Sequence, residues 1–252
     1  MSGSRLDDRG DHIVVSTPTN PSYWWGNFIL VDRVPGPDAS QEWLDRFAEA
    51  FPTAGHVALG FDGTAGRAED LAFFAGLGFH AEAQAVMTAS RVRPPRRVNR
   101  DAVCRELRSE RDWEQSVELR MGCQDRPADA GPGYLSAKAL ANRRMVRAGA
   151  AAWFGAFVED RLVAQLGLVQ VEEGLARFQS VETDPAFRRR GLAGTLVERA
   201  AAHGFERFGA RRLVMVADPG YFAADLDRSL GFATVETQLQ VERDSPLTVP
   251  AG

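Results

Sequence analysis

Apolar residues recur every three to five positions from Leu192 to Phe208 and fall on one stripe, so this segment is predicted to be an amphipathic helix. Before it, residues 175–185 alternate between apolar and polar side chains, are rich in strand-favouring residues, and end at a proline. The pattern therefore predicts a strand, a short loop and a helix in succession.

The same patterns predict further elements along the chain. Strands are expected at residues 27–32, 56–62, 102–108, 151–160 and 161–173, with a turn between the last two at Glu159 and Asp160. Helices are expected at residues 41–52, 66–75, 111–121 and 134–149. Strands and helices that alternate in this way place the chain in the mixed α/β class, with an α+β arrangement around a mixed sheet.

A Leu-Gly-Phe tripeptide occurs at residues 77–79 and again at residues 230–232. Each copy is followed by an alternating strand and preceded by the same order of strand, loop, helix, strand and short helix. Two similar units are therefore expected. Prolines and arginines interrupt the apolar pattern at residues 90–100, so we place the division between a domain at 1–97 and a domain at 98–252.

The loop between the strand predicted at residues 175–185 and the helix predicted from Leu192 carries three arginines and then Gly191. The first backbone N–H groups of a helix lack intrahelical partners and lie at the positive end of the helix dipole, so they can bind an anion. Gly191, Ala193 and Gly194 are small enough to leave such donors accessible. The loop thus predicts a site for a phosphate-bearing cofactor, whereas residues 33–40 of the first unit hold two prolines and are expected to have lost it.

Composition narrows the class of protein. The chain has 252 residues, 44% of them hydrophobic, and a net charge of −4, so no nucleic-acid partner is expected. Cys104 and Cys123 lie far apart without nearby histidine spacing, so neither a disulfide framework nor a metal site is expected. A polar N-terminal segment and the lack of a long apolar run predict a cytoplasmic protein that does not enter the membrane.

The pattern Arg188-x-x-Gly191-x-Ala193 between a strand and a helix, together with Ser-Leu-Gly-Phe at residues 229–232, resembles the GNAT N-acetyltransferase superfamily. Residues 98–252 cover the whole fold of that superfamily, and residues 12–89 look like a partial, degenerate second copy, as in tandem GNAT proteins. The resemblance implies acetyl-CoA or a related acyl-CoA as cosubstrate. It also implies an amine acceptor, either a small molecule or a protein.

The resemblance assigns the cofactor-binding residues by position in the motif. Those expected around the pyrophosphate are Arg188, Arg189, Arg190, Gly191, Leu192, Ala193, Gly194 and Thr195. Those expected to pair with the amides of the pantetheine arm, at the end of the preceding strand, are Val181, Glu182 and Thr183.

The catalytic groups are less well defined. Glu182 is either a general base beside the thioester or a solvated carboxylate at the end of a strand. Members of the superfamily often place a tyrosine acid four residues before the glycine of Gly-Phe, and here that position is Asp227. Tyr221, earlier in the same predicted helix, is the substitute candidate for the acid, while an anchoring aromatic residue and protonation by solvent are the alternatives.

Two functions follow from this interpretation. The first is an acyl-CoA-dependent N-acyltransferase, most simply an acetyltransferase that transfers acetyl directly to an amine. The second is a catalytically silent acyl-CoA-binding pseudoenzyme that acts as a sensor or binds a partner. The sequence leaves open which amine is the acceptor and whether the chain forms a homodimer.

Overall fold

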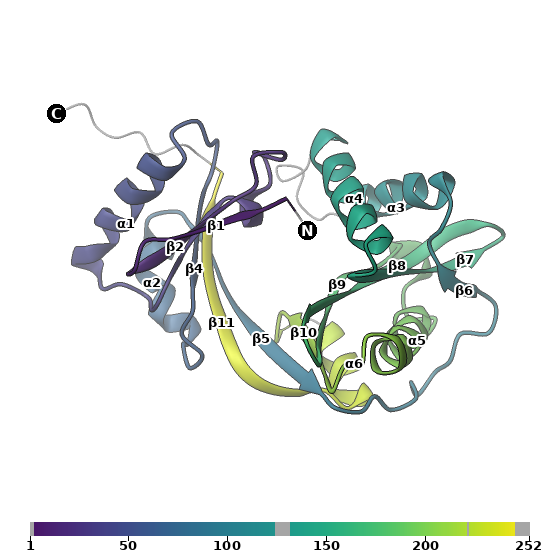
Figure 1. Cartoon of the computed structure of the whole chain (residues 1–252). Coiled ribbons are helices and arrows are strands. Elements are labelled where there is room, and N and C mark those ends of the chain that lie inside the picture. The colour runs from purple at the N-terminus through teal and green to yellow at the C-terminus, as the bar shows by residue number, and fades with distance from the viewer. Residues whose placement is uncertain (1–2, 124–131, 221, 245–252) are drawn as a thin grey trace. The chain divides into compact units, whose positions relative to one another are not determined.

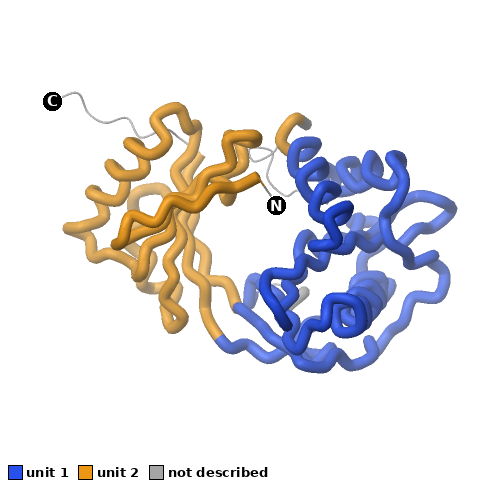
Figure 2. Tube along the Cα trace, viewed as in Figure 1, with its two compact units in different colours: residues 1–2, 86–127, 135–235 blue, residues 3–85, 128–134, 236–252 orange. Residues whose placement is uncertain are grey.

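The structure is a computed structural model that describes residues 3–123, 132–220 and 222–244 (Figure 1). The chain divides into two compact units (Figure 2). Unit 1 consists of residues 1–2, 86–127 and 135–235, and unit 2 consists of residues 3–85, 128–134 and 236–252. None of the helices in the described part of the chain has the length and apolar character needed to cross a membrane.

Unit 2 contains a sheet with the strand order β1-β2-β3-β4-β11. Its strands are β1 (Arg5–Asp8), β2 (His12–Ser16), β3 (Phe28–Val31), β4 (Val57–Phe61), the first part of β5 (His80–Ala89) and the last part of β11 (Ala233–Arg243). Its helices are η1 (Trp24–Gly26), α1 (Pro37–Ala50), η2 (Ala68–Leu71) and α2 (Ala72–Gly76). The strands β3 and β4 are parallel, and the pairs β1–β2, β2–β3 and β4–β11 are antiparallel.

The helices of unit 2 cover a core that includes Leu59, Phe47 and Phe74, each no more than 1% exposed. Helix α1 begins four residues before the predicted start, because Pro37 occupies its first turn, where a missing N–H costs nothing. The hairpin of β1 and β2 was not predicted. All four residues of β1 are exposed, so no alternation of apolar and polar side chains marks that strand.

Unit 1 contains the strand order β10-β9-β8-β7-β6. Its strands are β6 (Val103–Glu106), β7 (Ala151–Val158), β8 (Arg161–Glu172), β9 (Leu175–Thr183) and β10 (Arg212–Ala217), and β5 and β11 include residues of both units. The helices named in this part of the chain are α3 (Glu110–Cys123), α4 (Pro132–Arg147), η4 (Pro185–Phe187), α5 (Leu192–Arg207) and α6 (Phe222–Leu230).

Helices cover both faces of the sheet of unit 1, with α3 and α4 on one face and α5 and α6 on the other (Figure 1). The apolar stripe predicted for α5 is confirmed, since Leu192, Leu196 and Val197 are at most 2% exposed. The turn predicted between β7 and β8 is also confirmed. Glu159 and Asp160 have φ angles of 49° and 63°, the left-handed pair found in two-residue hairpin turns.

The parallel strands β9 and β10 are paired only at their first residues. Their register runs from Leu175 opposite Arg212 to Arg177 opposite Val214, and no later residue of either strand has a partner on the other. On its other side β9 stays paired with β8 as far as Thr183, through a bulge next to Ser180, whose φ is 50°. The two strands therefore diverge over their carboxyl-terminal halves and leave a gap in the sheet.

The domain boundary between residues 97 and 98 stays a prediction. The two compact units are defined by which residues lie close together, so they do not test where one sequence repeat ends and the next begins. Within unit 2, Leu239 and Val241 of β11 pair with Phe61 and Leu59 of β4. The last strand of the predicted second domain thus completes a sheet built from strands of the predicted first domain.

Candidate active site

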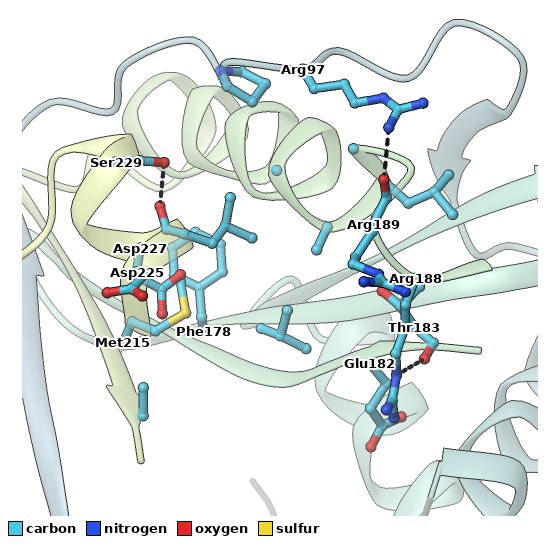
Figure 3. Close-up of a pocket in the computed structure, with 18 of the residues that line it drawn as sticks. Arg97, Phe178, Glu182, Thr183, Arg188, Arg189, Met215, Asp225, Asp227 and Ser229 are labelled. Carbon is cyan, nitrogen blue, oxygen red and sulfur yellow. Dashed lines mark hydrogen bonds between the residues drawn. The ribbon is translucent and has the colours of Figure 1, made fainter. Parts of the chain in front are cut away.

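A pocket of about 700 Å³ lies where β9 and β10 diverge (Figure 3). Its walls come from the end of β9, the end of β10, the loop that precedes α5, the helix α6 and residues 95–97. All of these segments belong to unit 1. The carboxyl end of a parallel strand pair beside a helix N-terminus is a common place for a ligand in α/β proteins.

The loop before α5 is held by residues from the arginine- and proline-rich segment at 90–100. Arg97 Nη1 donates to the carbonyl oxygen of Arg189 (2.8 Å), and Asn99 Nδ2 donates to the carbonyl oxygen of Arg190 (2.9 Å). Arg189 has a φ of 60°, a conformation that costs free energy for any residue other than glycine unless its surroundings fix it. The two hydrogen bonds supply that restraint.

The structure gives a second reason for glycine at positions 191 and 194, which the sequence did not reveal. Gly191 caps α5 with a φ of 81°, and a Cβ atom there would lie 2.4 Å from the carbonyl oxygen of Arg97. A Cβ atom on Gly194 would lie 2.9 Å from Cβ of Pro95. These residues are therefore small because residues 95–97 lie against them, in addition to the access that a ligand would need.

The structure brings most of the expected cofactor-binding residues to the pocket. The lining residues among them are Val181, Glu182, Thr183, Arg188, Arg189, Gly191, Leu192, Ala193 and Gly194. Arg190 instead packs over the ring of Phe187, and Thr195 donates its hydroxyl proton to the carbonyl oxygen of Gly191 (2.8 Å). Tyr221 lies outside the described residues.

Glu182 is largely buried and both of its carboxylate oxygens have partners. Arg120 Nη1 lies 3.0 Å from Oε1, and Gln165 Nε2 donates to Oε2 (2.7 Å). Burial raises the pKa of Glu182, while the charge of Arg120 and the hydrogen bond from Gln165 oppose that change. The solvated strand-end carboxylate considered from the sequence therefore does not describe this side chain, which is 16% exposed.

Arg120 and Gln165 were missed by the sequence analysis. Arg120 is in α3 and also donates to the hydroxyl of Ser180 (2.7 Å), at the bulge of β9. Gln165 is a polar residue in β8 that is only 2% exposed. The one available signal was Gln165 itself, because a polar residue within a long apolar strand must find a hydrogen-bond partner.

Two further ionisable groups line the pocket, the thiol of Cys123 and the carboxyl group of Asp227. Burial raises the pKa of the Cys123 thiol to about 11, with a further contribution from the charge of Glu182, so at neutral pH it is a protonated thiol and a poor nucleophile. Asp227 is only 3% exposed, and burial raises the pKa of its carboxyl to about 6.

The comparisons with known proteins agree with this geometry. Residues 113–232 match the model of the acetyltransferase (GNAT) family, a range that includes β9, the arginine loop and α5. No curated protein is similar to the chain in sequence at a significant level.

Solved structures similar to the chain cover almost all of it. A conserved protein of unknown function from Staphylococcus epidermidis is 13% identical with a TM-score of 0.77, covering 96% of this chain and 94% of its own. A GCN5-related N-acetyltransferase from Kribbella flavida is 14% identical with a TM-score of 0.64, covering 99% and 91%.

A tandem GNAT protein from the clavulanic acid biosynthesis pathway is 14% identical with a TM-score of 0.59, covering 96% of this chain and 83% of its own. At these identities the likeness establishes the fold, and it extends through both units, consistent with two GNAT-like units. The family match covers residues 113–232, which hold most of the segments that line the pocket, and identifies this part of the chain as a GNAT acetyltransferase domain.

Proposed function

We propose that this chain is an acyl-CoA-dependent N-acyltransferase, in the simplest case one that transfers acetyl from acetyl-CoA directly to an amine. The observation that carries the proposal is the pocket of about 700 Å³ at the diverging ends of β9 and β10, with the arginine loop and the start of α5 at one side. Residues 1–97 would form a degenerate GNAT-like copy and residues 98–252 the acetyl-CoA-binding domain.

The residues of the pocket fit the parts of such a cosubstrate. Arg188 and Arg189 supply positive charge beside the N-terminus of α5, which suits a pyrophosphate. Val181 and Thr183 belong to the part of β9 that has no partner on β10, so main-chain groups there can hydrogen-bond to an extended amide chain. A helix terminus contributes only about 0.3–2 kcal/mol to anion binding, so these contacts must act together.

The chemistry requires a neutral amine and a group that removes its proton. When bound, acetyl-CoA would supply a thioester whose carbonyl carbon the amine attacks. Glu182 is suited to accept the proton, because burial raises the pKa of its carboxyl and Arg120 and Gln165 hold it in place. Cys123 stays a thiol at neutral pH, which favours direct transfer over an acylated cysteine.

The first experiment is thermal unfolding of the full chain with and without acetyl-CoA, at about 100 times a micromolar Kd. Saturation at that level adds about 2.7 kcal/mol to the free energy of unfolding, or a shift of roughly 5–10 °C. Inorganic phosphate at the same concentration is the control and should give no shift. A chain that acetyl-CoA does not stabilise would contradict the proposal.

Binding is then followed by a turnover assay that detects free thiol with panels of small amines and of peptides with free amines. Release of thiol that depends on an amine identifies an N-acyltransferase and its acceptor class. Tight binding of acetyl-CoA without turnover on either panel would instead indicate an acyl-CoA-binding pseudoenzyme.

A further inference from the structure

A second pocket, of about 300 Å³, lies in unit 1 where the end of β5, the end of α6 and the start of β10 meet. The polar side chains of its walls are those of Arg91, Arg93, Arg212, Thr88 and Ser90. No acidic residue is among the described residues that line it. The pocket therefore combines three positive charges with two hydroxyl groups.

This pocket is separate from the candidate active site. No described residue lines both pockets. The last residues of β10, Met215–Ala217, line the active site, whereas its first residue, Arg212, lines the second pocket. A strand rises about 3.3 Å per residue, so the two ends of β10 are about 16 Å apart. Arg91 and Arg93 also precede residues 113–232, the range that matches the family model.

Main-chain contacts fix the segments that carry the arginines. The N–H of Arg93 donates to the carbonyl oxygen of Leu230 (2.8 Å), the last residue of α6, and the N–H of Arg212 donates to the carbonyl oxygen of Gly174 (3.0 Å). Gly231 has a φ of 103°, and a Cβ atom there would lie 3.3 Å from the carbonyl oxygen of Arg91. The segment of Arg91 and Arg93 thus lies against the end of α6, where glycine lets it approach.

The three guanidinium groups of the pocket have no counter-charge from the protein. None forms an ion pair or a hydrogen bond with another side chain in the part of the chain that the structure describes. Like charges around one pocket repel each other, and this group of three is a local feature because the chain as a whole has a net charge of −4. A ligand with several negative charges relieves that repulsion.

We propose that this pocket binds a small molecule with two or more phosphate groups, independently of the acyl-CoA cosubstrate. The planar guanidinium group presents paired N–H donors that match the oxygens of a phosphate, and the hydroxyls of Thr88 and Ser90 can donate to further oxygens. The described lining residues include no aromatic ring on which a base could stack. The phosphates are therefore the part of the ligand that the pocket recognises.

The test is calorimetric titration of the full chain with inorganic pyrophosphate at about 0.05 M salt, with the cosubstrate pocket saturated by acetyl-CoA. The wild type should bind pyrophosphate with a Kd of about 1 mM or tighter. Inorganic phosphate carries fewer charges and should bind more weakly, too weakly to raise the unfolding temperature at about 0.1 mM. Arg93→Gln and Arg212→Gln should each raise the Kd of pyrophosphate about 5–20-fold, because each removes a charge-assisted contact.

Arg211→Gln is the matched control. Arg211 is the neighbour of Arg212 and is also exposed, but it does not line the pocket. Its guanidinium lies on the other side, where a Cβ atom on Gly174 would be 2.7 Å from Cζ of Arg211. The Kd of pyrophosphate should change less than about 2-fold in this variant. All three substitutions are at exposed positions, so the unfolding temperatures without ligand should stay close to that of the wild type.

Four results would overturn the proposal. The first is a wild-type Kd weaker than about 1 mM, and the second is a Kd that Arg93→Gln and Arg212→Gln leave unchanged. The third is an equal loss in Arg211→Gln, which would indicate a diffuse positive surface. The fourth is weaker binding of acetyl-CoA to Arg93→Gln without any change for acetyl-dephospho-CoA, which would mean that the pocket holds the 3′-phosphate of the cosubstrate.

Failure of the proposed function gives a different result. If acetyl-CoA does not bind to the wild type, that function is wrong, and the titration with pyrophosphate is then made without it. Losses in Arg93→Gln and Arg212→Gln but not in Arg188→Ala would still place the phosphate ligand in the second pocket. Loss in Arg188→Ala alone would place it at the loop before α5 and would overturn the proposal.

Discussion

The starts of helices α1 in unit 2 and α5 in unit 1 closely resemble each other, and each follows a strand and a short loop. Both helices have a glycine at the N-cap, Gly36 and Gly191, and in both a hydroxyl four residues later donates to the carbonyl oxygen of that glycine, from Ser40 (2.9 Å) and from Thr195 (2.8 Å). Gly36 has a φ of −65°, whereas Gly191 has a φ of 81°. The helix starts are alike, and the loops that lead into them are not.

The strands differ as well. The parallel pair β3–β4 stays in register to its last residues, Val31 opposite Phe61, whereas β9 and β10 separate after Arg177 and Val214. The helix of unit 2 also begins with Pro37, which has no N–H to offer. The helix N-terminus that borders the pocket is therefore the one beside diverging strands and a loop held by Arg97 and Asn99, and the N-terminus of α1 lies beside strands that stay paired.

The largest difference between the two helix starts is expected when the glycine at each N-cap is replaced by alanine. Gly191→Ala places a Cβ atom 2.4 Å from the carbonyl oxygen of Arg97 at a left-handed φ, so the loop must move. We expect acetyl-CoA binding to weaken by about 100-fold, since strain of this kind costs roughly 1–3 kcal/mol and the displaced loop loses its contacts. Isothermal calorimetry measures the change.

Gly36→Ala is the matched control. No atom lies within 4 Å of a Cβ built there, and the φ of −65° suits any residue. Affinity for acetyl-CoA should be unchanged, with at most a small loss of stability from the altered cap. Equal effects of the two substitutions on binding would show that the loop before α5 is not the cofactor site.

A smaller loss of affinity is expected when one hydrogen bond that holds the loop before α5 is removed. Asn99→Asp removes the amide that donates to the carbonyl oxygen of Arg190 and keeps the oxygen that accepts from the main-chain N–H groups of Asp101 and Ala102. Loss of one such bond is worth about 0.5–1.5 kcal/mol, so affinity for acetyl-CoA should fall roughly 2–10-fold. An unchanged Kd would mean that residues 95–99 do not set the conformation of the loop.

Two arginines of the loop, Arg188 and Arg190, should contribute differently to binding because only Arg188 lines the pocket. Arg190 packs over the ring of Phe187 and does not itself line the pocket, whereas Arg188 does, so Arg188→Ala should weaken binding by a few-fold and reduce its salt dependence. Arg190→Ala should change neither. Calorimetric titrations at about 0.05 and 0.5 M salt test this, and equal losses for both variants would indicate a general charge effect instead of a defined contact.

The loop and its helix were predictable because their signals are local. The stripe of α5, the glycine at its start and the run of arginines all lie within twenty residues and act through backbone geometry. The divergence of β9 and β10 leaves no such trace, because strand register is set by partners distant in sequence. The hydrogen bond from Asn99 to Arg190 also leaves no local signal in the sequence, because it joins residues 91 positions apart.

The same limit applies to the two carboxyl groups of Glu182 and Asp227 in the pocket. Glu182 was identified from its place at the end of a strand, but its pairing with Arg120 from α3 depends on packing. Asp227 was identified by its position before the second Gly-Phe pair, but an aspartate in sequence carries no sign of its burial. The structure places the side chain at 3% exposure, and burial raises its pKa to about 6, so a larger fraction of it is protonated at neutral pH than of an exposed aspartate.

The smallest effect is expected when a backbone N–H donor is restored at the start of α1, where Pro37 has none. Pro37→Ala restores an N–H group in the first turn of α1 and should cost less than about 1 kcal/mol of stability, chiefly through the freedom gained by the unfolded chain. Introduced into the Gly191→Ala variant, where binding at α5 is already weak, it should produce no new binding of acetyl-CoA. The strands β3 and β4 remain paired to Val31 and Phe61, so a donor at the helix start has no gap beside it to receive the pantetheine arm. A recovered calorimetric signal would mean that backbone donors alone make the site, and the comparison between the two loops would then rest on the prolines and not on the divergence of the strands.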